Sequence, residues 1–102
     1  MAETNELKFP DFSGKCVSFS LKNEDACNDL SNPMFEYQGG RLFVVGKIPK
    51  GATKSDWAES FTAAIAWDRV VDYIVFDSED AFIEATKISE DYDKANSASN
   101  LA

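Results

Sequence analysis

The chain has 102 residues, which is enough for one domain with a hydrophobic core and too short for two. Its 18 acidic and 10 basic residues give a formal net charge of −8 at pH 7. This charge argues against binding to duplex DNA or to an anionic membrane, because binding to either depends on lysine and arginine neutralising phosphate groups.

The sequence indicates neither export nor a membrane span. Residues 1–6 lack the basic region and apolar run of a signal peptide, and no apolar run approaches the roughly 20 residues that cross a bilayer. Two cysteines are too few for a disulfide scaffold and do not have the ligand pattern of a zinc site. We therefore expect a cytoplasmic protein without a metal or cofactor, in which Cys16 lies in a strand, Cys27 lies in a polar loop, and both thiols are reduced.

The first predicted strand follows Gly14. Val17, Phe19 and Leu21 alternate with polar or small residues, which is typical of a strand with one buried face and one wet face. The residues before this strand, 1–9, are expected to be flexible. Residues 23–33 have the composition of a polar connection.

The clearest local signal is a β-hairpin at Gly39-Gly40. Two glycines readily take the positive φ angles of a two-residue turn, and the runs over 34–38 and 41–48 are rich in strand-forming residues. The return strand is apolar on both faces, so we expect it to be internal in the sheet and covered on both sides. Gly46 within it predicts a bulge or bend.

Residues 55–67 fit both helical and strand spacing. Asp56 and Glu59 approximate a capping box, whereas the apolar residues from Ala63 onward crowd too closely for one helix face. We predict a short helix near 55–60 and a strand over 62–67, with a single helix over 55–67 as the alternative.

The last predicted elements are a strand and a helix. A tight turn over 68–71, with room for one 3₁₀ turn, leads into a strand over 72–76. Asp77 or Ser78 then caps a helix near 78–89, which has acidic residues in its first turn. The polar residues 90–102 are expected to form a flexible tail.

Together these elements predict a single, mainly β domain of the α+β type over 1–102. About five short strands without a long βαβ unit favour an antiparallel sheet curled into a small barrel. The order of hairpin, strand, one-turn helix and closing strand resembles the SH3-like topology; an OB-like or other α+β arrangement is the alternative. One core cluster is expected to contain Phe19, Phe43, Val45, Ile65, Val75 and Phe82.

The sequence lacks the residues of common catalytic sites. Without histidine there is no Ser-His or Cys-His pair, and Gly39-Gly40 is not followed by a helix that would present its amides to a phosphate. Asp72 and Asp77 should point to opposite faces of a regular strand, which makes them a poor acid–base pair. We therefore expect no enzymatic activity, with a carboxylate-dependent enzyme as the least favoured alternative.

Aromatic residues with polar tips are the best candidates for a binding site. The predicted site residues are Trp57, Tyr37, Trp67, Tyr73 and the neighbouring Asp68. Trp57 lies on a connection, where its large ring favours a groove or a subunit contact. We predict a non-enzymatic interaction module with an aromatic groove near Trp57 and Tyr37 for a protein partner or a second copy. The alternative is a binder of a small cationic or amphipathic ligand held by cation–π contact.

One long segment of the sequence suggests a relationship to other proteins. It contains Asn32-Pro33, the hairpin that ends at Ile48-Pro49, Trp57, and the stretch from Ala66-Trp67-Asp68 to Asp77-Ser78. This segment, over 32–78, resembles small uncharacterised bacterial proteins, including those carried on mobile integron gene cassettes. The resemblance covers about half of the chain. It implies a bacterial, cytosolic accessory protein and assigns no catalytic residue.

Overall fold

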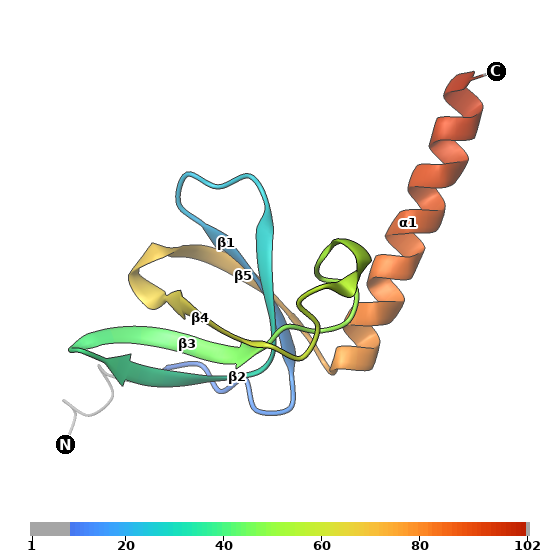
Figure 1. Cartoon of the computed structure of the whole chain (residues 1–102). Helices are drawn as coiled ribbons and strands as arrows, with labels where there is room; N and C mark the ends of the chain where they lie inside the picture. Colours follow the sequence, from blue (N-terminus) through green and yellow to red (C-terminus); the bar gives the residue numbers. More distant parts are fainter. Residues whose placement is uncertain (1–8, 102) are drawn as a thin grey trace.

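The computed structural model describes residues 9–101, with the backbone alone for 92–101. Five strands form one antiparallel sheet in the order β4-β3-β2-β1-β5, and a long helix leaves the sheet at one end (Figure 1). The α+β class expected from the sequence is confirmed. The elements are β1 (Cys16–Leu21), β2 (Cys27–Gln38), β3 (Arg41–Lys47), η2 (Lys54–Asp56), β4 (Thr62–Ala66), η3 (Trp67–Arg69), β5 (Val70–Phe76) and α1 (Glu79–Leu101).

The sheet is curled but open, so the expected closed barrel is wrong. Closure would require the two end strands of the sheet to pair with each other. Among the described residues, β4 pairs with β3 alone and β5 pairs with β1 alone. Residues of β4 and of the first half of β2 instead line a pocket between them.

β2 is longer than expected and changes its partner midway. It begins at Cys27, inside the predicted polar loop, so the loop position of Cys27 is wrong. Residues 27–31 pair with β1, residues 34–38 pair with β3, and the register shifts between Ser31 and Met34. Gly46 of β3 lies against this irregularity, since a Cβ there would stand 2.9 Å from the carbonyl oxygen of Ser31. The irregularity therefore lies in β2 opposite Gly46 and not in β3 as predicted, and the glycine permits a close approach of the two backbones.

The core lies on one face of the curled sheet. Phe19 and Ile65 belong to it as expected, but Val44 is the buried residue of β3. Because neighbours in a strand point to opposite faces, Phe43 and Val45 lie on the other side of the sheet. The prediction that these two residues join the core is wrong. The buried cluster consists of Phe12, Val17, Phe19, Leu30, Val44 and Ile65.

The first turns of α1 cover part of the second face. The buried ring of Phe82 meets Phe76 of β5 edge to face, with 5.4 Å between the centroids. Cys16, paired with Phe76, is fully buried on the same face. The face of β1 that was expected to be wet is therefore dry at this end. Both Val75 and Phe82 were predicted in the core, but Val75 is exposed and Phe82 packs on this second face.

The local elements agree with the remaining predictions in part: the short helix predicted near 55–60 is reduced to the 3₁₀ turn η2, whereas the strand predicted over 62–67 is present as β4. A single 3₁₀ turn and a strand replace the ambiguous segment, so one helix over 55–67 is excluded. The hydroxyl oxygen of Ser78 accepts a hydrogen bond from the backbone N–H of Ala81 at 3.0 Å, which caps α1 as expected. The helix continues to Leu101, beyond the predicted end near residue 89. Flexibility of residues 90–102 stays a prediction.

Candidate functional site

Two of the predicted site residues lie together. The rings of Trp67 and Tyr73 are 6.1 Å apart between centroids, on the core face of the sheet. Phe35 meets Trp67 edge to face at 4.9 Å, and Phe12 meets Tyr73 in the same way at 5.2 Å. We call this group the aromatic cluster; its rings are those of Phe9, Phe12, Phe19, Phe35, Trp67 and Tyr73. Its edge-to-face contacts are those of a packed core, with Phe9 and Tyr73 at the exposed rim.

The other two aromatic candidates lie far from each other. Tyr37 is 67% exposed beside the Gly39-Gly40 turn, where it pairs with Leu42 at the beginning of β3. Trp57 is 71% exposed on the connection after η2, beyond the other end of β3. The seven residues of β3 separate them. The predicted groove near Trp57 and Tyr37 is therefore not assembled, because a hairpin tip and the far connection lie at opposite ends of the strand.

Asp68 has a partner of its own. Its carboxylate accepts a hydrogen bond from Nη2 of Arg41 at 2.9 Å, and this bond lowers the pKa of Asp68. The guanidinium of Arg41 also lies 5.7 Å from the ring centroid of Phe43. Both charged side chains are exposed, so the pair links η3 to the beginning of β3 and contributes little to stability.

The outer edge of β5 is unusually apolar for a sheet edge. Val71 and Ile74 are 61% and 60% exposed, and Val75 and Tyr73 are also exposed. In antiparallel strands the backbone groups of alternate residues point to the same neighbour. The N–H of Asn32 donates to the carbonyl of Lys15, so the backbone groups of the odd-numbered residues of β1 point to β2 and those of the even-numbered residues point to β5. The backbone groups of Tyr73 and Val75 therefore point away from β1, to the free edge.

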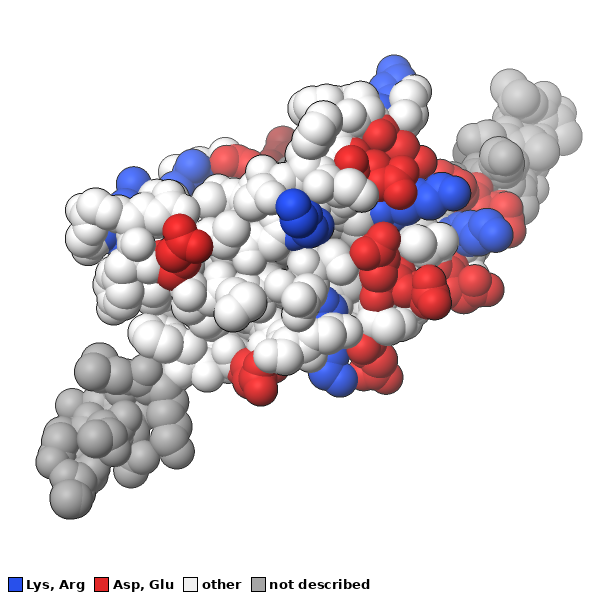
Figure 2. All heavy atoms as spheres, turned by 60° about the horizontal axis from the view of Figure 1, so that its bottom comes forward, with Lys and Arg blue, Asp and Glu red and all other residues white. Residues whose placement is uncertain are grey.

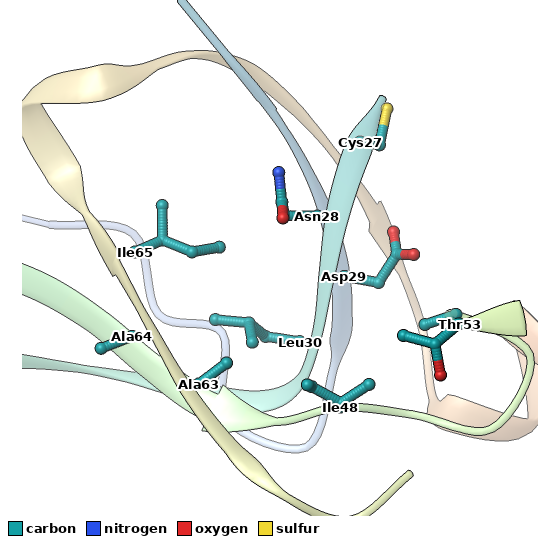
Figure 3. A pocket seen from close by; sticks show the side chains of 10 residues that line it. Cys27, Asn28, Asp29, Leu30, Ile48, Thr53, Ala63, Ala64 and Ile65 are labelled. Carbon is teal, nitrogen blue, oxygen red and sulfur yellow. The ribbon is translucent and has the colours of Figure 1, made fainter. Parts of the chain in front are cut away.

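A pocket of about 240 Å³ lies between β2 and β4. Figure 3 shows Ala63, Ala64 and Ile65 on one side and Thr53 on the other, with the edge of β2 between them. The same alternation turns the backbone N–H and C=O groups of Cys27 and Asp29 away from β1, to the edge that the pocket occupies. The full lining is Cys27, Asn28, Asp29, Leu30, Ile48, Ala52, Thr53, Ala63, Ala64 and Ile65.

Asp29 gives this pocket its charge. Its side chain is half-buried, and Ser18 Oγ donates a 2.6 Å hydrogen bond to Oδ1. Burial raises the pKa of Asp29, and the bond from Ser18 opposes that rise in part. Among the ion pairs of the described residues, none involves Asp29.

Sequence reasoning missed this pocket because residues 23–33 are polar enough to pass for a loop. The run Cys27-Asn28-Asp29-Leu30 also lacks the alternation of apolar and polar residues that would have indicated a strand. The pocket also differs from the predicted cation–π ligand site, since no aromatic ring lines it.

Charges are unevenly spread over one face of the molecule. On the face shown in Figure 2, acidic and basic side chains gather toward the end that leads into α1, and the middle is largely uncharged. Among the side chains that the structure describes, those of residues 9–91, no three of Cys, Asp or Glu are grouped as metal ligands require. No helix within residues 9–101 is both long enough and apolar enough to cross a bilayer.

Comparison with known proteins identified no relative. The chain matches no protein-family model, and neither the curated proteins nor the solved structures contain a match.

Proposed function

We propose that the chain is a non-enzymatic interaction module that docks through the outer edge of β5, and that its partner is a second copy of itself. The observation that carries this proposal is the combination of unpaired backbone groups and exposed apolar side chains on one edge strand. Such an edge is a template for another strand, which would supply hydrogen bonds and cover the apolar surface.

The composition of β5 supports docking. Proteins commonly protect free edges with lysine, proline or inward charges. The sequence of β5, Val-Val-Asp-Tyr-Ile-Val-Phe, contains no lysine, arginine or proline and has Asp72 as its one charge. A register irregularity between Ser20 and Leu21 disturbs the pairing near Val70. The regular part of the edge is therefore 72–76.

The regular part fits a second copy. A two-fold axis makes identical strands pair antiparallel, and its natural centre on 72–76 is Ile74. In that register Tyr73 pairs with Val75 of the other copy, so all their outward N–H and C=O groups find partners. Asp72 faces the other copy's Phe76, which avoids a like-charge contact in spite of the net charge of −8. The exposed Ile74 packs against its own equivalent on the axis.

The strand order also supports an SH3-like arrangement, which we propose for the fold. The order β4-β3-β2-β1-β5 and the 3₁₀ turn η3 between the last two strands agree with that topology. The proposed fold leaves β5 at an edge that is available to a partner.

Val75→Pro tests the docking surface. The N–H of Val75 points away from β1, so proline should leave the internal ladder intact while blocking an added strand. We expect the wild type to dimerise with rising concentration in analytical ultracentrifugation and the variant to sediment as a monomer with an unchanged far-UV circular dichroism spectrum. Trp57→Ala is the matched control, because it removes an exposed aromatic side chain away from β5 and should preserve the dimer.

Two results would overturn the proposal. One is a wild type that stays monomeric up to millimolar concentration. The other is a dimer that survives Val75→Pro; if the same dimer is lost in Trp57→Ala, the contact lies at Trp57 instead.

A further inference from the structure

We propose that the pocket between β2 and β4 binds a small aliphatic ammonium ion, with the carboxylate of Asp29 as its counter-ion. This site is separate from the edge of β5, since β2 and β1 lie between the pocket and that edge in the strand order.

The polar part of the pocket presents the carboxylate of Asp29 together with unpaired backbone C=O and N–H groups. Oδ1 of Asp29 is occupied by Ser18, whereas Oδ2 has no donor among the described residues. The outward carbonyl groups of Cys27 and Asp29 belong to an unpaired stretch of strand edge. An ammonium group has three donors and no acceptor, so it can bond the free carboxylate oxygen and the outward carbonyl groups and leaves the outward N–H groups to water.

The charge of the lining favours a cation. No lysine or arginine lines the pocket, so the half-buried carboxylate of Asp29 lacks a compensating charge there. A carboxylate away from water is stabilised by an opposite charge. A divalent metal fits less well, because Ca²⁺ and Mg²⁺ require about six oxygen ligands and one carboxylate supplies few of them.

The rest of the lining, which Figure 3 shows mostly on the other side of β2 from the Asp29 carboxylate, favours a ligand whose aliphatic body reaches across the strand edge. Its apolar side chains are small or branched and none is aromatic; they belong to Leu30, Ile48, Ala52, Ala63, Ala64 and Ile65. At ~30 Å³ for each water-sized group, the 240 Å³ cavity holds a ligand of about eight non-hydrogen atoms. Hexylammonium has a suitable size and combines the charged head with an aliphatic chain.

The test is a titration of ¹⁵N-labelled full chain with hexylammonium, 1-hexanol and hexanoate, followed by ¹H–¹⁵N chemical shifts. We expect saturable shifts at the amides of 27–30 and 63–65 with hexylammonium. Its affinity should exceed that of hexanol by about tenfold, the effect of one charge-assisted hydrogen bond. Hexanoate should not bind, because its carboxylate would be repelled by the carboxylate of Asp29.

Asp29→Asn should bring hexylammonium and hexanol to within about twofold of each other, since the amide still accepts from Ser18 but carries no charge. Asp25→Asn removes the same charge from the exposed neighbouring loop and should keep the wild-type preference. Shifts elsewhere on the surface, absence of saturation, or equal binding of hexylammonium and hexanol by the wild type would overturn the proposal. So would an unchanged preference in a folded Asp29→Asn variant. None of these results depends on the oligomeric state.

Discussion

The two cysteines show how position within one strand pair sets the chemistry of a side chain. Cys16 pairs with Ser31 at one end of β1, and Cys27 pairs with Ser20 at the other. Four residues of strand, at ~3.3 Å each, separate their levels by about 13 Å, which is too far for a disulfide. Burial raises the pKa of Cys16 to about 12, whereas Cys27 is exposed.

Alkylation should therefore distinguish the two thiols. The reactive species is the thiolate, and Cys16 is both inaccessible and protonated at pH 8. Mass spectrometry after iodoacetamide treatment should show one adduct, on Cys27, and a second adduct after unfolding. Reductant should leave the melting temperature unchanged. Rapid modification of native Cys16 would contradict its burial.

Asp29 should make stability depend on pH in the direction opposite to a typical ion-paired carboxylate. Its pKa is raised in the folded state, so the folded chain binds the proton more tightly than the unfolded chain. Above the folded pKa the ionised group lowers stability, and this penalty disappears as pH falls toward the ordinary value of 3.8.

Asp29→Asn should accordingly stabilise the protein at pH 7 and lose that advantage as pH falls toward 4. The groups that face Asp29 are Ser18, which bonds it, and the neutral thiol of Cys16. Urea unfolding of both proteins between pH 4 and pH 7 measures the difference. If the stability advantage of Asp29→Asn over the wild type grew toward low pH, the pKa of Asp29 would not be raised by burial.

At the scale of elements, the close approach of β2 to β3 requires a residue without a side chain at position 46. A Cβ on Gly46 would lie 2.9 Å from Ser31 O, 3.1 Å from Leu30 Cβ and 3.2 Å from Pro33 Cα. Two of these atoms are backbone and Pro33 is buried, so the neighbours have little freedom to move.

Gly46→Ala should destabilise the fold by about 1 to 3 kcal/mol, the usual cost of forcing extra atoms into a packed site. Gly39→Ala offers a comparison, because no atom lies near its added Cβ and the cost there comes from the positive φ alone. Urea denaturation of both variants tests this. A Gly46→Ala variant with wild-type stability would contradict the close packing of β2 against β3 at this position.

Elements with a strong local signal were predictable from the sequence. The hairpin, η3 and the capped start of α1 each depend on residues next to one another in the chain. The first half of β2 was not predictable, since its polar residues are held by pairing with β1 and that contact is not local. For the same reason the sequence could not decide whether Phe43 or Val44 faces the core.

The candidate site was predictable in part. Aromatic side chains pointed to Trp67 and Tyr73, which do lie together, but the edge of β5 depends on strand order. Asp29 lies on a segment without a motif, and its pocket exists because β2 leaves β3 at Ser31. Such a site follows from the topology and has no signature in residue types.

The molecule as a whole is elongated. Its extents are 63 × 26 × 25 Å and its radius of gyration over Cα atoms is 16.1 Å. A compact domain of this length would have a radius of gyration of about 13 Å. The difference comes from α1, which leaves the sheet after its first turns (Figure 1).

Small-angle X-ray scattering should detect this shape in solution. The monomeric Val75→Pro variant is the suitable sample, because pairing through β5 would change the radius of gyration for another reason. We expect a radius of gyration near 16 Å. A value near 13 Å, as for a compact domain, would mean that α1 folds back onto the sheet.

The link between β5 and α1 consists of Asp77 and Ser78, so the direction of the strand determines where the helix begins. In the proposed two-fold pair the two β5 strands run in opposite directions. The helices would then leave a continuous ten-stranded sheet at opposite ends of the seam. Pairing through β5 would therefore set the two α1 helices apart from each other by the length of the seam.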